Sequence, residues 1–190
     1  VLLWPALALL WLAAIYGNAD AAAWQKQATG KHTLAVSLFA WPLRLMYRAN
    51  MAYWLRGKAL SAQATERIHV GSVLAAPDFH AVVDVCAEYP MAHMPSYYTT
   101  VPMLDMVPAD VAALRAAADA LHQMLQQQNQ PVLVCCALGY SRSVAVVLVY
   151  LLRQRHAHDL QAALKLLQQA RPDMVVSPAN QQQILKAAHE

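Results

Sequence analysis

A cysteine and an arginine separated by five residues form the part of this chain whose residue types could perform chemistry. Cys136 and Arg142 lie in the segment VLVCCALGYSRSVAVVLVYLL, residues 132–152, between two strongly apolar runs. A cysteine thiolate is a nucleophile, and a planar guanidinium group fits two oxygens of one phosphate group. The pair therefore suits phosphoryl transfer through a covalent cysteinyl-phosphate.

The residues between them are typical of an anion-binding loop. If a strand ends at Cys136 and a helix begins near Arg142, successive backbone N–H groups point into one concavity at the helix N-terminus. The positive field there favours negative charge on the thiol. Gly139 supplies a backbone angle or a close approach that a side chain would obstruct, and Ser143 places a hydroxyl near the sulfur. The predicted phosphate-binding loop consists of Ala137, Leu138, Gly139, Tyr140, Ser141 and Arg142.

Two adjacent cysteines compete for the role of nucleophile. Only Cys136 is separated from Arg142 by five residues, and on a strand Cys135 points to the opposite face. Without this context, two cysteines in an apolar strand are most often simply buried, and a redox pair with a regulatory role is a further alternative. Cys86, in another apolar run, is expected in the core.

From about residue 62 the hydrophobic pattern is that of an α/β domain. The predicted strands span 67–74, 80–88, 97–104 and 130–136. The predicted helices span 111–128, 142–157, 160–170 and 178–190, with Asp110, Asp159 and Ser177 as N-caps of the first, third and fourth. The predicted fold class is therefore α/β, with a central, mostly parallel sheet flanked by helices.

This loop and its surroundings resemble the cysteine-dependent protein tyrosine phosphatase superfamily, and CALGYSRS is most similar to the dual-specificity branch. The resemblance covers about residues 63–190, including a late Arg-Pro turn at 171–172. It implies that Asp105, 31 positions before Cys136, is the general acid and then the base that activates water. It also implies that Ser143 assists loss of the thiolate. Asp105 could instead cap a turn, with Asp110 as the rival acid.

Two features depart from the family pattern. Cys135 stands where relatives usually have a histidine that helps to order the loop and to tune the thiolate, so the enzyme could be slow or the domain a phosphate-binding module without activity. Ala137 and Leu138 are neutral, whereas relatives that act on phosphoinositides tend to carry basic residues in the loop. A highly anionic headgroup is therefore not specially favoured.

Composition divides the chain into two parts. Residues 1–65 carry six Lys or Arg against one acid, whereas residues 66–190 carry eight against ten. Hydrophobic residues make up 58% of the chain and charged residues 13%, with a mean hydropathy of +0.28. A basic, aromatic-rich first third predicts a membrane-facing segment, and a mildly acidic remainder argues against nucleic-acid binding. Three cysteines without a disulfide spacing favour a reducing compartment.

The first 61 residues are predicted to meet the membrane. Residues 1–17 carry no charge and reach the lower length limit for a transmembrane helix, although a signal peptide or a buried helix is an alternative. Residues 18–61 are predicted to be a basic, aromatic juxtamembrane segment lying in the interface, with a helix packed against the soluble domain as the alternative. The positive-inside rule then puts the catalytic domain, 62–190, on the cytoplasmic side of the inner membrane.

The sequence thus predicts a phosphomonoester hydrolase, with phosphoproteins carrying phosphotyrosine, phosphoserine or phosphothreonine as the first substrate class. A membrane lipid phosphate, such as phosphatidylglycerophosphate, is the alternative substrate. The N-terminal part is also similar to the linker that follows phosphatidic-acid-phosphatase-type membrane domains in some bacterial fusion proteins. No metal-ligand spacing or nucleotide motif is present, so neither a metal nor another cofactor is expected.

Overall fold

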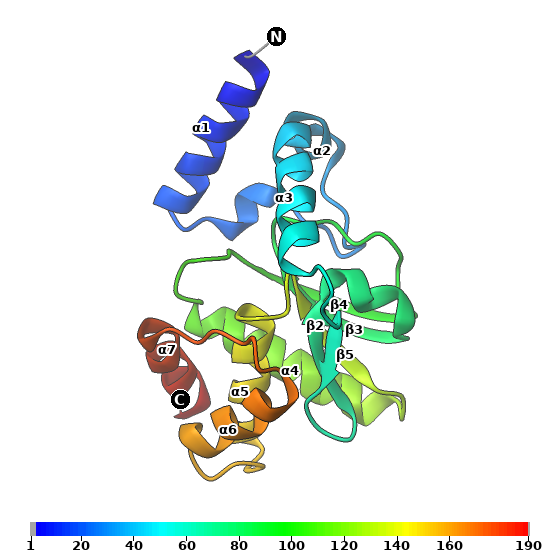
Figure 1. The fold of residues 1–190 in the computed structure, drawn as a ribbon, viewed down its shortest axis with the longest axis vertical. Coiled ribbons are helices and arrows are strands. Elements are labelled where there is room, and N and C mark those ends of the chain that lie inside the picture. The colour runs from blue at the N-terminus through cyan, green and yellow to red at the C-terminus, as the bar shows by residue number, and fades with distance from the viewer. Residues whose placement is uncertain (1–2, 190) are drawn as a thin grey trace.

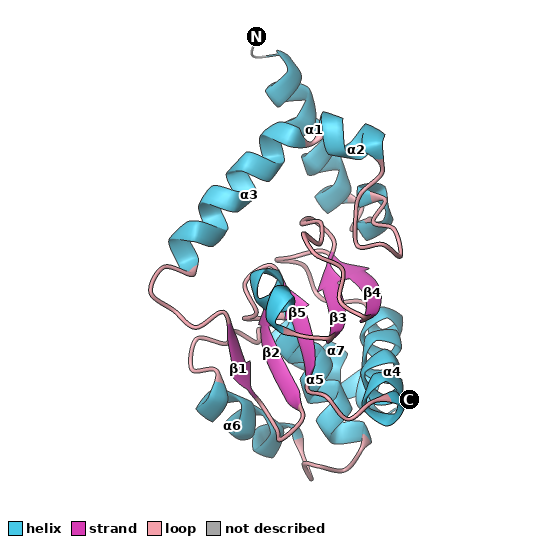
Figure 2. Cartoon of the chain, turned by 90° about the vertical axis from the view of Figure 1, so that its right-hand side faces the viewer, coloured by secondary structure: helices cyan, strands magenta, loops and turns pink. Residues whose placement is uncertain are grey.

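A five-stranded sheet in the order β1-β2-β5-β3-β4 forms the centre of the protein (Figure 1, Figure 2). The computed structural model describes residues 3–189. The strands are β1 (Ser61–Gln63), β2 (Ile68–Ser72), β3 (Ala81–Cys86), β4 (Tyr97–Met103) and β5 (Val132–Cys136). β1 is antiparallel to β2, and every other neighbouring pair is parallel. The predicted α/β fold with a central, mostly parallel sheet is confirmed.

Four helices follow the pattern expected from the sequence. They are α4 (Val111–Gln127), α5 (Arg142–Arg153), α6 (Leu160–Ala170) and α7 (Pro178–His189). α4 and α5 pack on one face of the sheet, and α6 and α7 pack against α5. The side chains of Asp110, Asp159 and Ser177 accept backbone N–H groups in the first turns of α4, α6 and α7, which confirms the three predicted N-caps.

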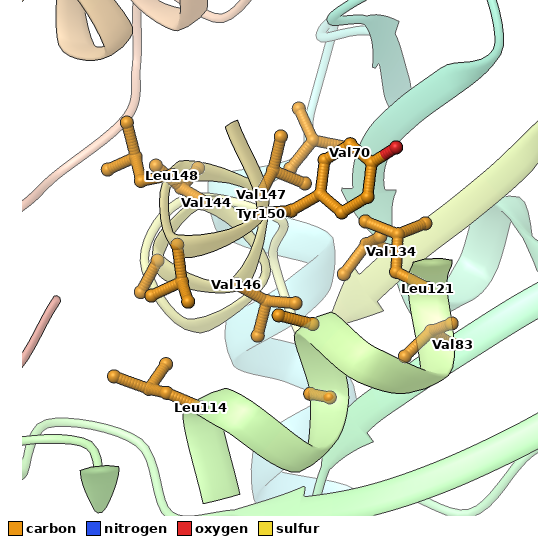
Figure 3. Close-up of a cluster of buried hydrophobic side chains, with 14 of the residues drawn as sticks. Val70, Val83, Leu114, Leu121, Val134, Val144, Val146, Val147, Leu148 and Tyr150 are labelled. Carbon is orange, nitrogen blue, oxygen red and sulfur yellow. The ribbon is translucent and has the colours of Figure 1, made fainter. Parts of the chain in front are cut away.

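The side chains of α5 fill the middle of the main core (Figure 3). Val144 and Val147 of α5 are fully buried in one cluster with Val70 of β2 and Val134 of β5. α5 ends at Arg153, earlier than predicted. Arg155 adopts a left-handed backbone angle, φ 55°. The N–H groups of residues 154–157 donate to carbonyl groups of residues 150–152, which ends the helix.

The opposite face of the sheet is covered by a short 3-10 helix, η2 (Val73–Asp78), and by the end of a long helix from the N-terminal segment. β2 ends at Ser72, not at 74, because the Ser72 hydroxyl accepts the Leu74 N–H and starts η2. β1 was not expected, since three residues are too short to show a period-two pattern.

Residues 3–60 contain four helical elements gathered at one end of the molecule (Figure 2). These are α1 (Leu3–Gly17), the 3-10 helix η1 (Ala21–Trp24), α2 (Leu34–Phe39) and α3 (Trp41–Trp54). Within residues 3–189, no helix combines the length and the apolar character needed to cross a bilayer. The predicted transmembrane helix over 1–17 is therefore not supported: its described part is a helix of 15 residues.

The N-terminal segment packs against the sheet domain. Trp24 and Leu43 are buried in one cluster with Ala87, just after β3, and Leu104, just after β4. The side chain of Lys26 is fully buried, and its Nζ donates to Asp84 Oδ2 at 2.5 Å and to the backbone carbonyls of Cys86 and Tyr89. One face of this segment therefore packs against the sheet domain, as in the alternative given for residues 18–61.

Candidate active site

Cys136 lies at the C-terminal end of the central strand β5, at the floor of the loop 137–141. Its side chain is 3% exposed, and its sulfur accepts the Gly139 N–H at 3.2 Å. The Ser143 hydroxyl, in the first turn of α5, lies 3.5 Å from the same sulfur. A backbone donor and a hydroxyl therefore both reach the position where a thiolate would carry its charge.

Gly139 is required here for two separate reasons. Its φ of +76° lies in the left-handed region, which side chains disfavour. A Cβ at this position would lie 2.3 Å from the carbonyl carbon of Gly71 in β2. Both possibilities raised from the sequence, the unusual angle and the close approach, therefore hold at once.

Three carbonyl groups of the loop bond outward, to groups that lie behind it. Ser72 Oγ donates to the Ala137 carbonyl at 2.6 Å, Arg171 Nη2 donates to Leu138 at 3.0 Å, and the Val175 N–H donates to Tyr140 at 2.8 Å. In a trans peptide the N–H points away from the carbonyl of the same unit. The N–H groups of the following residues are therefore turned to the inner side of the loop, where an anion would bind.

Arg142 is held by one edge of its guanidinium group and leaves the other edge available. Nη1 donates to Glu88 Oε2 at 2.6 Å and to the Met103 carbonyl at 2.7 Å. Nη2 lies 3.4 Å from Asp105 Oδ2. Nε is buried and has no hydrogen-bond partner among residues 3–189. The Nε and Nη2 edge thus has the geometry for two oxygens of one phosphate group.

Glu88 is the site residue that sequence reasoning missed. Its Oε2 accepts from Arg142, and its Oε1 accepts the Asp105 N–H at 2.7 Å. Burial opposes its charge, but Arg142 and the surrounding hydrogen bonds outweigh burial, so the pKa of Glu88 lies below its usual value. The only sequence signal was an acid at the end of the predicted strand 80–88, which did not reveal that its partner lies 54 residues away.

Asp105 lies in the loop after β4 and reaches the same centre. Its side chain is 34% exposed, so water and substrate can contact it, and its carboxylate faces Arg142. The rival acid, Asp110, accepts the Ala113 N–H at 2.9 Å and caps α4. The geometry therefore favours Asp105 over Asp110 as the acid beside the loop.

The N-terminal segment also contributes to this centre. Tyr16, near the end of α1, donates its hydroxyl to Glu88 Oε1 at 3.2 Å. Burial and the neighbouring Glu88 charge both raise the pKa of Tyr16, which therefore stays protonated as a donor. Glu88 thus joins three parts of the chain: α1, the Asp105 loop and Arg142.

The other two cysteines lie apart from the sulfur of Cys136. Cys135 packs on the opposite face of the sheet with Leu133, whereas Cys136 belongs to the main core cluster. Burial, followed by the charge of Asp84, raises the pKa of the Cys135 thiol well above its usual value. Burial likewise raises the pKa of Cys86, which lies in the core as predicted, with its sulfur 3.5 Å from Glu88 Oε2.

A cavity of about 530 Å³ lies over this loop, which is more space than a phosphate group alone would fill. Arg142 is its only cationic lining residue, and most of the wall is apolar. Among residues 3–189 no group of His, Cys, Asp and Glu side chains could hold a metal ion. The lining residues are Trp54, Asp105, Met106, Val107, Pro108, Leu138, Tyr140, Ser141, Arg142, Val175, Ser177, Ala179 and Asn180.

Known proteins share this architecture. The family model "Dual specificity phosphatase, catalytic domain" matches residues 63–190. Human DUSP28 is 24% identical with a TM-score of 0.60, over 68% of this chain and 93% of that one. A mouse putative dual specificity phosphatase complexed with zinc tungstate is 24% identical with a TM-score of 0.61, over 70% and 89%. PTPMT1 in complex with PI(5)P is 16% identical with a TM-score of 0.56, over 68% and 95%.

The structural likenesses show the fold, and the family model covers the loop, Arg142, Asp105 and Glu88 together. A cysteine at the end of the central strand, followed by a nest of N–H groups and a buried arginine, is the arrangement that this family's chemistry needs. The chain belongs to the dual-specificity phosphatase catalytic-domain family and is a cysteine-dependent phosphatase.

Proposed function

We propose that Cys136 is the nucleophile of a two-step phosphomonoester hydrolysis. In the first step its thiolate attacks phosphorus, the S–P bond forms, and the ester P–O bond breaks. Asp105 gives its proton to the leaving oxygen. In the second step the Asp105 carboxylate takes a proton from water, the water oxygen bonds to phosphorus, and the S–P bond breaks. The Ser143 hydroxyl, 3.5 Å from the sulfur, stabilises the departing thiolate.

The observation that carries this proposal is the edge of Arg142 formed by Nε and Nη2, which Glu88 and Met103 leave unbonded. Because Nη1 is held by Glu88 and Met103, the guanidinium group is fixed before substrate arrives, with Nε unpartnered. A fixed donor pair and the inward N–H groups of the loop stabilise charge on the equatorial oxygens without reorganisation during the reaction. These groups supply the charge stabilisation on which the proposed mechanism relies.

The proposed substrates are phosphoproteins. The wall of the cavity is mostly apolar and contains Trp54 and Met106, which suits the body of a phosphorylated side chain and its neighbours. The neutral Ala137 and Leu138 give no second anion site inside the loop. The open rim is compatible with phosphotyrosine and with phosphoserine or phosphothreonine.

Phosphate release from p-nitrophenyl phosphate and from matched phosphopeptides tests this proposal. The full chain should hydrolyse both, and Cys136→Ser should lose activity while it still binds phosphate. Cys135→Ser is the matched control, because it removes the neighbouring thiol from the opposite face and should keep turnover. Activity retained in Cys136→Ser would refute the mechanism, and phosphate binding without turnover in the wild type would favour an inactive phosphate-binding domain.

The second candidate substrate is a membrane lipid phosphate, with the enzyme acting at the cytoplasmic face of the inner membrane. The supporting observation is the exposed apolar surface of α1, α2 and α3, where Leu34 is 75% and Leu38 61% exposed. Such a surface, with basic residues around it, is typical of peripheral membrane contact. Phosphate release from phosphatidylglycerophosphate in liposomes, compared with phosphopeptide at equal enzyme, would decide between the two classes.

A further inference from the structure

A second cavity, separate from the one over Cys136, lies between the N-terminal helices and the chain that follows β3. It has a volume of about 420 Å³ and shares no lining residue with the cavity over the loop. α2 and α3 supply one wall, and residues 89–92 supply the other. The lining residues are Lys31, His32, Ser37, Arg44, Arg48, Tyr89, Pro90, Met91 and Ala92.

The charge of this cavity is positive and uncompensated. Arg44 and Arg48 are four residues apart on α3, so they lie on the same side of the helix, and Lys31 lines the same cavity. Within residues 3–189 none of these three has an ion-pair partner. No acid occurs in the sequence between Asp20 and Glu66. Three cations that converge on one hollow favour an anionic ligand.

His32 forms part of the wall without adding charge. Its Nε2 lies 2.8 Å from the Ala87 carbonyl. Burial lowers the pKa of His32, and the nearby charges of Lys26 and Arg44 lower it further, so the ring is neutral at physiological pH. The positive charge of the cavity therefore comes from Lys31, Arg44 and Arg48.

Exposed apolar side chains adjoin these cations. A smaller hollow of about 130 Å³ is lined by Trp41 and Leu45 together with Arg44, Arg48 and Tyr89. Trp41 is 52% exposed, and the ring of Trp4 from α1 stacks beside it with a centroid distance of 6.2 Å. A soluble phosphate would gain nothing from this rim. The acyl and glycerol part of a lipid would cover it, and indole rings favour the level of the headgroups.

We propose that the pocket of Lys31, Arg44 and Arg48 binds the phosphate group of an anionic phospholipid, while Trp4, Trp41 and Leu45 enter the membrane interface. This rests on the proposed action at a membrane and names the surface and the lipid class that would hold the enzyme there. The bound lipid is a docking partner at this pocket, and the phosphomonoester that reacts enters the other cavity.

Co-sedimentation with vesicles tests the proposal on the full chain. Vesicles of phosphatidylcholine alone are compared with vesicles that also contain phosphatidylglycerol, whose phosphodiester is not a phosphomonoester substrate. The wild type should bind the anionic vesicles more tightly, and added salt should weaken this binding. The double variant Arg44→Gln, Arg48→Gln should bind them about 30-fold more weakly, from the contribution of each basic residue near an anionic surface.

The matched control is Arg155→Gln, Lys165→Gln, which removes two exposed charges. Lys165 is on α6 and Arg155 in the segment that precedes it, and α6 lies at the end of the molecule opposite α1, α2 and α3 (Figure 1). It should bind as the wild type does. Leu45→Gln should weaken vesicle binding without changing the dependence on salt. Turnover of p-nitrophenyl phosphate should be unchanged in all of these variants, which shows that they are folded and separates lipid docking from catalysis.

Several outcomes would overturn the proposal. Equal vesicle binding by the wild type and by Arg44→Gln, Arg48→Gln would overturn it. A loss of vesicle binding in Arg155→Gln, Lys165→Gln as large as in Arg44→Gln, Arg48→Gln would also overturn it. Displacement by millimolar glycerol phosphate, together with no preference for vesicles, would assign the pocket to a soluble phosphate. Failure of p-nitrophenyl phosphate turnover with vesicle binding intact would instead count against the proposed catalytic function alone.

Discussion

Glu88 Oε2 accepts a hydrogen bond from Arg142 Nη1 at 2.6 Å, and both side chains are almost completely buried. A buried carboxylate and a buried guanidinium stabilise each other only while both remain charged and bonded. Here the pair also determines which edge of Arg142 faces the loop. Stability and phosphate binding therefore depend on the same contact.

The Glu88 contact should appear in the pH dependence of stability. The pKa of Glu88 is lowered in the folded protein, so its contribution is present above the unfolded value of about 4.5 and is lost as the pH falls through the folded pKa. Glu88→Gln should lower the free energy of unfolding at pH 7 by about 3 kcal/mol, because Arg142 stays buried without a counter-charge. Urea unfolding of both proteins between pH 7 and pH 3 measures this.

The difference between wild type and Glu88→Gln should shrink below pH 4.5. A difference that stays constant down to pH 3 would contradict the assigned charge of Glu88. Glu66→Gln is the control, since Glu66 is exposed and should change stability by only a few tenths of a kcal/mol.

Tyr16→Phe removes one donor from Glu88 and leaves the ring in place. A hydrogen bond to a charged group contributes about 1.5 to 3 kcal/mol, and at 3.2 Å the lower value is expected. Because Glu88 orients Arg142, KM for p-nitrophenyl phosphate should rise several-fold. Tyr53→Phe removes the hydroxyl of an exposed tyrosine on α3 and should change neither the free energy of unfolding nor KM. Unchanged kinetics in Tyr16→Phe would show that α1 serves stability alone.

Asp105→Asn should lower kcat by about 10² or more, because the leaving oxygen would depart without a proton. Asp110→Asn is the matched control: asparagine caps a helix as well as aspartate, so α4 and the activity should both persist. A larger loss in Asp110→Asn than in Asp105→Asn would transfer the role of acid to Asp110.

Gly139→Ala should abolish phosphate binding. The added methyl group would overlap the Gly71 backbone at 2.3 Å, and the left-handed angle would be strained as well. The loop must therefore shift, and the Gly139 N–H leaves Cys136. Tungstate or phosphate binding by calorimetry measures the effect, with circular dichroism to show that the sheet is retained. Wild-type affinity in Gly139→Ala would contradict the loop geometry.

The sequence predicted best those features whose partners are close along the chain. The loop is bounded by Cys136 and Arg142 within seven residues, and the caps at Asp110 and Asp159 bond to N–H groups three residues on. Each of these depends on local backbone geometry, so residue type and spacing suffice to predict it. Strands β3 and β5 are buried along their whole length, so their mostly apolar runs are enough to predict them.

Contacts between distant segments could not be predicted in this way. Glu88 meets Arg142 only because β3 and β5 are neighbours in the sheet, and one acid after an apolar strand does not indicate that partner. The predicted membrane helix is not supported by residues 3–189, for a related reason. Hydropathy counts apolar residues in 1–17, but it does not reveal that Ile15 is buried against the protein or that Tyr16 reaches Glu88.

The buried pair of Lys26 and Asp84 makes the functional unit larger than the family boundaries. A protein cut at residue 60 would keep the loop and every proposed catalytic group, yet Asp84 would remain inside the sheet without its cation. Removing one partner of a buried ion pair costs about 3 to 5 kcal/mol, which is a large part of the stability of a domain of this size. The N-terminal helices therefore belong to the folding unit of the phosphatase, and excising the family domain alone should yield a protein that unfolds easily.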